Sequence, residues 1–284
     1  MRLAAIDIGS NAARLLIAEV SNDKEGKPQF NKLNLVRVPL RLGFDVFDKG
    51  EISKEKRGMI LQTMKAYGHL INAYNVEKVI TCATSAMRDA RNSADIIRKV
   101  KLETGLEIEI ISGDLEASLI YENHVAENMD TDHSYLYIDV GGGSTELTFF
   151  ADGKLVFKQS FNIGTIRLLK DMVDDAKWNE VKDFIKLKTK GYKKIIAIGT
   201  GGNINKVFSL SKRKDGKPLS LELLKDYYKE IASYSLADRI NIYKLREDRA
   251  DVIVPALLIY INVMRWADAD EIRKIKEGLA ALTS

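Results

Sequence analysis

Two segments with the same order of residue types could bind a phosphate chain. The first runs from Asp7 to Asn11 as Asp-Ile-Gly-Ser-Asn, and the second runs from Asp139 to Glu146 as Asp-Val-Gly-Gly-Gly-Ser-Thr-Glu. In each segment a carboxylate ends an apolar run, and a turn containing glycine and serine follows. Glycine lets the backbone approach an anion closely and direct its N–H groups toward it. The repeated pattern therefore predicts two turns that bind phosphate oxygens, beside carboxylates that bind a divalent metal.

The residues after each turn distinguish these segments from better-known phosphate loops. A Walker loop needs Gly-Lys-Ser/Thr at the start of a helix, and a dinucleotide fingerprint needs its third glycine on a helix. Here Arg14 to Val20 and Leu147 to Phe150 are short, apolar and partly β-branched or aromatic, which is typical of strands. We therefore predict two β-hairpins. Ordinary glycine-containing hairpins are the alternative, and the repetition of an Asp-led pattern favours the phosphate interpretation.

The predicted roles follow from the atoms that each turn offers. Amides and hydroxyls reach phosphate oxygens without steric bulk, so we expect phosphate to be bound by Gly9, Ser10, Asn11, Gly141, Gly142, Gly143, Ser144 and Thr145. Magnesium prefers hard oxygen ligands, often partly through water, and the expected metal ligands are Asp7, Asp139 and Glu146. The alternative for each carboxylate is that it only accepts hydrogen bonds from turn amides.

Composition indicates a globular protein with room for two domains. The chain has 284 residues, of which 45% are hydrophobic and 30% charged, and its net charge of +4 suits a protein that binds polyanions. No apolar run approaches the roughly 20 residues of a membrane-spanning helix, and we expect no secretory signal. The single cysteine, Cys82, excludes an internal disulfide and fits a reducing compartment. We therefore expect a cytoplasmic protein without a membrane partner.

Strands and helices alternate in both halves of the chain, which predicts two α/β domains built on mixed sheets. In the first half we expect a strand at Leu33–Leu42 and a helix that begins after Ser53 and ends near Tyr74. The second half repeats this plan, and its last helical group is expected to include Asp270–Leu282. We place the domain boundary in the polar segment that begins at residue 129, so that the domains are 1–128 and 129–284.

Two further segments have open interpretations. Gly199–Asn203 is a third glycine-rich loop at the carboxyl end of a predicted strand, where α/β folds bind ligands, although its pattern is not a dinucleotide fingerprint. Lys177–Lys194 contains seven lysines, which could form either the solvated face of a helix or a basic track for a long phosphate chain. The spacing of the lysines does not separate these alternatives.

Together the motifs resemble those of the exopolyphosphatase/guanosine pentaphosphate phosphatase (Ppx/GppA) family, within the actin and hexokinase superfamily. The similar segments extend along essentially the whole chain and are Asp7–Asn11, Arg41–Gly43, Ala83–Asn92, Ile111–Ile120, Asp139–Glu146, Gly199–Asn203 and Lys276–Leu279. The chain is similar to the short two-domain form. The resemblance implies two ribonuclease H-like α/β domains with a cleft between them. It also implies a C-terminal helix, over about 270–284, that packs back on the first domain.

The resemblance also implies which residues between the two turns act on the substrate. Glu116 aligns with the family's catalytic glutamate and is the expected general base for an attacking water. Arg88 is the expected phosphate clamp, because a guanidinium matches two phosphate oxygens; a structural ion pair with Asp89 is its alternative. The chain departs from the family pattern at Ala12, where the family has serine, and at Leu115, where it has glutamate. These departures concern substrate preference or metal affinity.

The resemblance predicts a Mg²⁺-dependent exopolyphosphatase that releases orthophosphate from the end of inorganic polyphosphate. A guanosine pentaphosphate (pppGpp) phosphohydrolase is the closest alternative, because the same site could act on both substrates. An ATP-dependent small-molecule kinase would need an adenosine pocket at Gly199–Asn203, and a non-catalytic alarmone binder is a further alternative. No metal-ligand spacing relates His69, His124 and His133. We expect no nucleic-acid partner and, from the resemblance, a homodimer.

Overall fold

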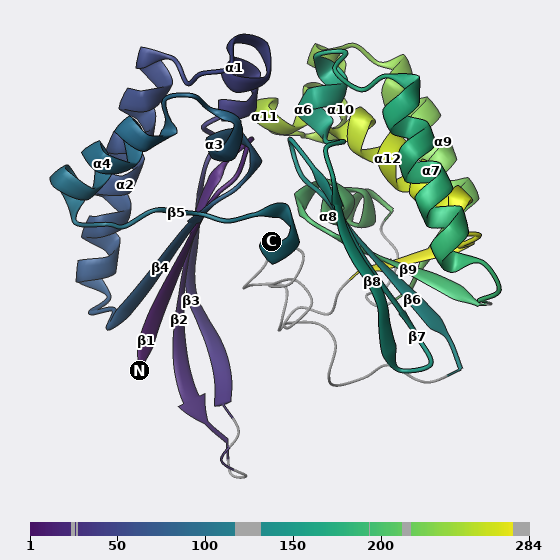
Figure 1. Cartoon of the computed structure of the whole chain (residues 1–284), viewed down its shortest axis with the longest axis horizontal. Helices are drawn as coiled ribbons and strands as arrows, with labels where there is room; N and C mark the ends of the chain where they lie inside the picture. Colours follow the sequence, from purple (N-terminus) through teal and green to yellow (C-terminus); the bar gives the residue numbers. More distant parts are fainter. Residues whose placement is uncertain (24–25, 27, 117–131, 193, 212–216, 275–284) are drawn as a thin grey trace. The chain divides into compact units, whose positions relative to one another are not determined.

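The chain divides into two compact units, Met1–Ser112 and Gly113–Ser284, in a computed structural model. The structure describes all residues except 24–25, 27, 117–131, 193, 212–216 and 275–284 (Figure 1). The predicted domain boundary between residues 128 and 129 lies outside the described residues. Each unit contains one mixed sheet with helices packed on it, so the predicted α/β class is confirmed.

The first unit contains a five-stranded sheet in the order β3-β2-β1-β4-β5. Its strands are β1 (Arg2–Ile8), β2 (Ala13–Asn22), β3 (Pro28–Val38), β4 (Lys78–Ala83) and β5 (Glu109–Ile110). β1, β2 and β3 are antiparallel neighbours, whereas β4 is parallel to β1. The strand that we expected at Leu33–Leu42 is shifted, because β3 ends at Val38 and Leu42 begins a helix.

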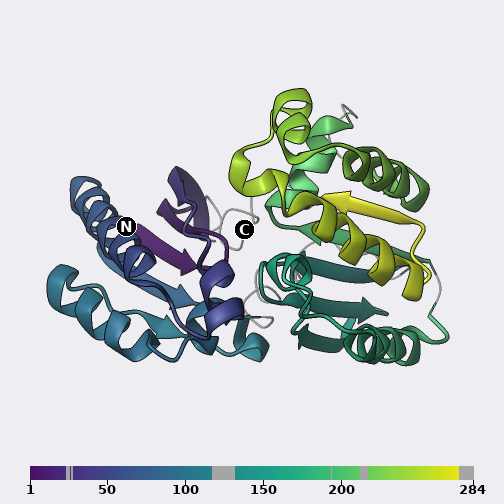
Figure 2. The same ribbon diagram turned by 90° about the horizontal axis from the view of Figure 1, so that it is seen from above.

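Helices cover one face of this sheet. They are α1 (Leu42–Lys49), α2 (Lys54–Ala73), α3 (Ser85–Asp89) and α4 (Ser93–Thr104). Ser53 caps α2 as predicted, and its Oγ accepts a hydrogen bond from Lys56 N. Buried side chains of α2 recur at helical spacing from Ile60 to Ile71, and α2 contacts both α4 and β2 (Figures 1 and 2). The apolar side of α2 thus packs on the sheet through β2.

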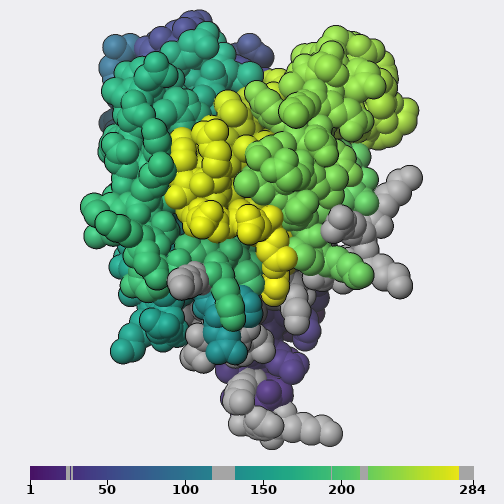
Figure 3. Space-filling model, turned by 90° about the vertical axis from the view of Figure 1, so that its right-hand side faces the viewer, coloured from purple at the N-terminus to yellow at the C-terminus, as the bar shows by residue number. Residues whose placement is uncertain are grey.

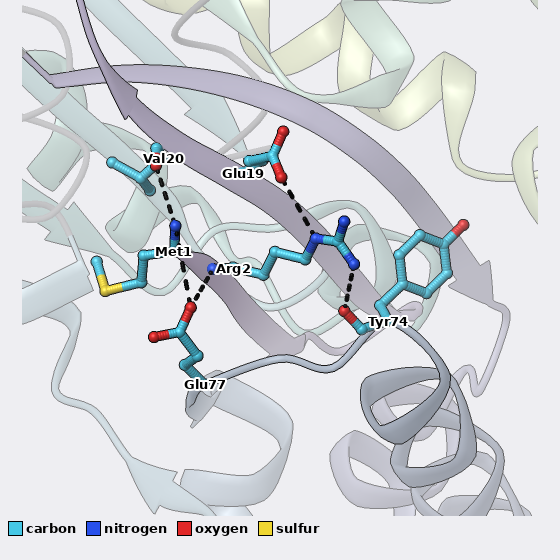
Figure 4. A network of polar contacts seen from close by, with 6 residues as sticks. All are labelled: Met1, Arg2, Glu19, Val20, Tyr74 and Glu77. Atoms are coloured by element: carbon cyan, nitrogen blue, oxygen red, sulfur yellow. Dashed lines mark hydrogen bonds and ion pairs between the residues drawn. The ribbon is translucent and has the colours of Figure 1, made fainter.

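A polar network fixes the amino-terminal end of β1, opposite the end that carries the first turn (Figure 4). Arg2 donates to Tyr74 O at 2.9 Å through Nη1 and to a Glu19 carboxylate oxygen at 3.4 Å through Nε. The backbone N–H of Arg2 donates to Glu77 Oε1 at 3.0 Å, and the amino group of Met1 donates to Val20 O at 3.3 Å. The two contacts of the Arg2 side chain are partly buried, whereas the other two are exposed. They join β1 to β2 and to the segment after α2.

The second unit contains a six-stranded sheet in the order β10-β11-β9-β6-β7-β8. Its strands are β6 (Ser134–Val140), β7 (Thr145–Ala151), β8 (Lys154–Phe161), β9 (Ile195–Thr200), β10 (Leu219–Ser220) and β11 (Glu271–Lys274). The run β8-β7-β6-β9-β11 repeats the order and directions of β3-β2-β1-β4-β5 in the first sheet. The predicted repetition of one plan in both halves is thereby confirmed.

The helix that we expected at Asp270–Leu282 is wrong for residues 271–274, which form β11. Ile272 pairs with Ala197 of β9 in parallel and with Leu219 of β10 in antiparallel, and it is fully buried. Pairing with distant strands overrides the local preference of a short polar segment. Residues 275–284, on which the rest of that expectation and the C-terminal helix depend, lie outside the described part of the chain.

The second sheet packs against α12, the most buried helix of this unit. The helices here are α6 (Thr165–Leu169), α7 (Asp175–Thr189), α8 (Gly202–Leu210), α9 (Leu221–Ser233), α10 (Leu236–Tyr243), α11 (Glu247–Ala250) and α12 (Ile253–Trp266). α12 contacts β6 and also α6, α7, α8 and α9; Figure 3 shows its yellow atoms between the greens of α7 and α9. Within the described ranges, the helices are all too short or too polar to cross a membrane.

Candidate functional site

The two predicted hairpin turns have the same closing hydrogen bond. Between β1 and β2, Gly9 N donates to Ala12 O at 3.0 Å, and between β6 and β7, Gly141 N donates to Ser144 O at 2.9 Å. Each turn follows a strand that carries an aspartate one residue before its last position. The two β-hairpins and the internal repeat that the sequence predicts are therefore confirmed.

The first turn is held from one side by the start of α1. Ser10 O accepts from Gly43 N at 2.9 Å, and Asn11 O accepts from Arg41 N at 2.8 Å. In a planar trans peptide the N–H points away from the C=O of the same unit, so the amides of Asn11 and Ala12 face away from α1. The chain thus supplies amide donors on the side of the turn that α1 does not cover.

The second turn is held in the same way by the segment that begins α6. The three glycine carbonyls accept hydrogen bonds from that segment: Gly141 O from Thr165 N at 3.0 Å, Gly142 O from Ile166 N at 2.8 Å, and Gly143 O from Arg167 Nε at 2.7 Å. By the same peptide geometry, the amides of Gly142, Gly143 and Ser144 face the opposite side. Three neighbouring donors on one side of a turn form a site suited to an anion.

Gly164 allows the start of α6 to reach the second turn. A Cβ at this position would lie 2.5 Å from the carbonyl carbon and oxygen of Gly142 and from the carbonyl carbon of Gly143. The Oγ1 of Thr145 also donates to Ile163 O at 2.5 Å, which joins the start of β7 to the same segment. The turn is therefore fixed by close packing that only glycine permits.

The two carboxylates of the second hairpin lie in a row of polar side chains across the sheet. Asp139 of β6 pairs in register with Glu146 of β7 and with Thr200 of β9, and Glu146 pairs with Ser160 of β8. Partners in register place their side chains on the same face of a sheet. Ser160 Oγ donates to Glu146 Oε1 at 2.9 Å, and Glu146 is only 4% exposed. The hairpin thus brings together two of the three predicted metal ligands.

The third glycine loop lies against Asp139. Gly201 adopts φ 91°, and a Cβ at this residue would lie 3.1 Å from Asp139 Oδ1. Tyr260 of α12 donates its hydroxyl to Thr200 O at 2.5 Å. Burial, and secondarily the charge of Asp139, raise the pKa of Tyr260 well above its usual value, so Tyr260 remains a hydrogen-bond donor. The loop that the sequence left without a role therefore contributes to the surroundings of Asp139.

Asp7, the third predicted metal ligand, belongs to the first unit and pairs with Arg14. The Arg14 Nη1 lies 3.2 Å from Asp7 Oδ2, and the two residues are in register across β1 and β2. Arg14 occupies the position that Glu146 has in the second hairpin. Desolvation outweighs the charge of Arg14 and raises the pKa of Asp7 above its usual value. Among the described residues, no three His, Cys, Asp or Glu side chains form a metal-binding group.

A buried pair of hydroxyls supports the first turn. Ser10 Oγ lies 2.7 Å from Ser85 Oγ, and both residues are less than 5% exposed. Ser85 is the first residue of α3, and Thr84 N donates to Ile8 O at 3.1 Å, which joins the start of α3 to the end of β1. The contact uses one of the two hydroxyl protons, so the other can be donated to a phosphate oxygen. Sequence reasoning missed Ser85 as a site residue, although it lies in the Ala-Thr-Ser-Ala block.

We expect Ser85→Ala to lower kcat/KM for phosphate release about fivefold, which corresponds to about 1 kcal/mol for one neutral hydrogen bond. The reason is that the Ser10 hydroxyl loses the partner that orients it. Steady-state phosphate release by Ser85→Ala, Ser10→Ala and the double variant measures the effect. The double variant should be no slower than Ser10→Ala, and Ser85→Thr should recover activity. Independent, multiplicative losses would contradict a shared role.

The structure describes both predicted catalytic residues, Arg88 and Glu116. Arg88 of α3 is half-buried and donates through Nη1 to Ile111 O at 2.6 Å, which holds the chain just before Glu116. Residues 113–116 are helical, as expected for the start of that segment, and Glu116 is half-buried. Leu115, the departure from the family's glutamate, is 42% exposed. Neither the catalytic role of Glu116 nor the clamping role of Arg88 is tested by these contacts.

The lysine-rich segment forms much of α7. Lys186 and Lys188 are exposed in the last turn of this helix, where positive charge is favourable beside the carbonyl end. Acidic residues, including Asp183, lie between the lysines along the chain. The helical surface fits the solvated-face alternative, and the basic track stays a prediction.

Comparison with known proteins agrees with this arrangement. Residues 19–280 match the Ppx/GppA phosphatase family. The chain is 35% identical over 198 residues to a bifunctional 3-dehydroquinate synthase/phosphatase of Fusobacterium nucleatum, covering 67% of this chain and 29% of that protein. It is 27% identical over 175 residues to exopolyphosphatase 1 of Mycobacterium bovis, covering 62% of this chain and 50% of that protein. The chain thus spans half or less of the length of these relatives.

Solved structures resemble almost the whole chain. A Ppx/GppA family member from Aquifex aeolicus superposes with a TM-score of 0.73 at 25% identity, covering 99% of this chain and 95% of that one. An exopolyphosphatase from Cytophaga hutchinsonii, at 24% identity, has the same fold, with a TM-score of 0.83 over 99% and 96% of the two chains. With its two repeated hairpin turns and this match over residues 19–280, the chain belongs to the Ppx/GppA phosphatase family.

Proposed function

We propose that the protein hydrolyses the terminal phosphoanhydride of inorganic polyphosphate and releases orthophosphate. The observation that carries this proposal is the second turn, in which three amides face one side while the carbonyls are bonded on the other. Fixed donors of this kind stabilise the charge of a transferring phosphoryl group. Relatives that are named exopolyphosphatases support polyphosphate as the substrate.

The proposal assigns a role to the backbone amides and to the serine hydroxyls of each turn. Each turn offers its own backbone donors to phosphate oxygens: the amides of Asn11 and Ala12 in the first unit, and the amides of Gly142 to Ser144 in the second. The hydroxyls of Ser10 and Ser144 add donors, whereas Ala12 supplies only its amide. Hydrolysis of a phosphoanhydride depends mainly on positioning the phosphoryl group and neutralising its charge. Rigid hydrogen-bond donors in the turns would supply both effects.

Magnesium fits the second hairpin. Asp139 and Glu146 would hold it, because they lie side by side in register, and Glu146 is a buried carboxylate. Within the described residues, the buried Thr200 hydroxyl beside Asp139 has no hydrogen-bond partner, as expected beside a group that the protein does not itself supply. When bound, Mg²⁺ would neutralise charge on the phosphate oxygens. At Asp7 of the first unit, the ion pair to Arg14 would compete with metal binding.

Glu116 and Arg88 complete the proposed mechanism. Glu116 accepts the proton of the attacking water, and Arg88 donates to oxygens of the phosphate. Arg88 donates one hydrogen bond to Ile111 O through Nη1, and its other guanidinium N–H groups are the proposed donors to phosphate. The proposed setting is the cytoplasm, in keeping with a single cysteine and hence no internal disulfide, and the proposed assembly is a homodimer, which light scattering tests.

Phosphate release tests the proposal directly. The purified protein should release orthophosphate from long-chain polyphosphate in the presence of Mg²⁺. This release should stop when EDTA removes the metal. Short polyphosphate, pppGpp and ATP are run in parallel at matched concentrations of hydrolysable ends. Preference for pppGpp would select the alternative phosphohydrolase, and release from none of the four would reject a hydrolase function.

A further inference from the structure

We propose that the Thr200 hydroxyl is part of the metal site of the second hairpin, where it accepts a hydrogen bond from a metal-bound water. The proposal rests on the proposed magnesium function of Asp139 and Glu146, and it adds a neutral oxygen to the two carboxylates. Thr200 is 5% exposed, and its Oγ1 is buried without a hydrogen-bond partner among the described residues. Burying a hydroxyl in this way is unfavourable unless a ligand or a water molecule forms a hydrogen bond with it.

The sheet directs this hydroxyl to the carboxylates. Thr200 of β9 is paired in parallel register with Asp139 of β6, and Asp139 is paired with Glu146 of β7. The three side chains therefore lie on one face, on three neighbouring strands. Strands in a sheet are spaced about 4.8 Å apart, which is close enough for these groups to share the water ligands of one ion.

The backbone of Thr200 is fixed independently of its side chain. Tyr260 donates its hydroxyl to Thr200 O at 2.5 Å, and the next residue, Gly201, lies so close to Asp139 that a Cβ would be 3.1 Å from Oδ1. These contacts hold the carboxyl end of β9 against Asp139. The position of the Thr200 side chain is thus set by the backbone and by register, while its hydroxyl keeps its hydrogen-bonding capacity for a ligand.

A water bound to a cation could donate the hydrogen bond that the Thr200 hydroxyl would accept. A water bound to Mg²⁺ uses a lone pair for the metal and can then only donate hydrogen bonds. The carboxylates of Asp139 and Glu146 accept such bonds, and the threonine oxygen is a further acceptor beside them. Its own hydrogen remains available for an oxygen of the phosphate. A valine at this position would have the same shape and neither property.

Metal affinity and stability together test this assignment. Mn²⁺ serves as the probe, and titration calorimetry without substrate measures its Kd for the wild type, Thr200→Val and Thr200→Ser. Loss of a group that orients metal ligands typically weakens binding about tenfold or more, so Thr200→Val should bind Mn²⁺ about tenfold more weakly. Thr200→Ser should bind within about twofold of the wild type. Metal-free Thr200→Val should also unfold at a temperature at least as high as the wild type, because an unpaired buried hydroxyl has been removed.

Thr189→Val is the matched control. Thr189 is also a buried threonine of the second unit, but its hydroxyl donates to Ile185 O within α7 at 2.8 Å. This variant should lose stability and keep its Mn²⁺ affinity. Unchanged Mn²⁺ affinity in Thr200→Val, or a drop in its metal-free unfolding temperature, would overturn the proposal. A wild type that binds Mn²⁺ but releases no phosphate would instead reject the proposed function alone.

Discussion

Replacing Glu116 by glutamine should lower kcat for phosphate release about 10²–10⁴-fold, the range that general base catalysis contributes. Glutamine has nearly the same shape but cannot accept the proton of the attacking water. The turns and the carboxylates of the second hairpin are untouched, so KM should change little. Initial rates across a range of polyphosphate concentrations separate the two parameters, and a binding measurement with the non-hydrolysed complex confirms that the substrate is still held.

Glu107→Gln is the control for this experiment. Glu107 is an exposed glutamate of the first unit whose carboxylate pairs with Lys101 Nζ at 2.7 Å on the surface. Surface pairs of this kind contribute little to stability, and Glu107→Gln should release phosphate at the wild-type rate. If Glu116→Gln were equally active, Glu116 would be excluded as the base, while the roles of the two turns would stand.

Gly164→Ala should reduce kcat/KM for phosphate release about 10²-fold, because displacement of catalytic donors by about 1 Å has effects of that size. The added Cβ would lie 2.5 Å from backbone atoms of Gly142 and Gly143, so the turn or the start of α6 must move. The same crowding should lower the free energy of unfolding by about 1–3 kcal/mol, as overpacking does elsewhere. Steady-state kinetics and denaturant unfolding measure the two effects.

Gly58→Ala provides the comparison. Gly58 lies within α2, where a Cβ meets no atom within 4 Å. Alanine is favoured over glycine inside a helix by about 0.5–1 kcal/mol, so this variant should be as active as the wild type and slightly more stable. A fully active Gly164→Ala would show that the second turn is not the rigid donor site proposed here.

Local signals in the chain were sufficient for much of the fold. Ser53 caps α2 as predicted, because a helix start depends on side-chain and backbone atoms only a few residues apart, and Ser220 caps α9 in the same way. The two hairpin turns could be predicted for the same reason, since each is closed by a bond between residues three apart. α10 was not predicted. It buries none of its residues, and its short span, Leu236–Tyr243, leaves little room for a helical pattern to repeat.

The placement of the candidate residues could be predicted where they belong to one turn, and only incompletely where they do not. Gly141 to Glu146 were recognised from their types and order. Ser160 and Gly164 were missed, and Thr200 was noted only as part of the third glycine loop, because each meets the second hairpin only through strand pairing or helix packing. A lone serine, glycine or threonine carries no signal of its own in one sequence.

By itself, then, the sequence determined the two turns, the aspartate that precedes each turn, and the order of strands that is repeated in the two halves of the chain. Those features depend on backbone preferences and on contacts between residues close in the chain. Only the tertiary structure decided that Thr200 lies beside Asp139, on the side away from Glu146, and that residues 271–274 form a strand. Both outcomes depend on the register of strands that are far apart in the chain, and packing of the whole unit sets that register.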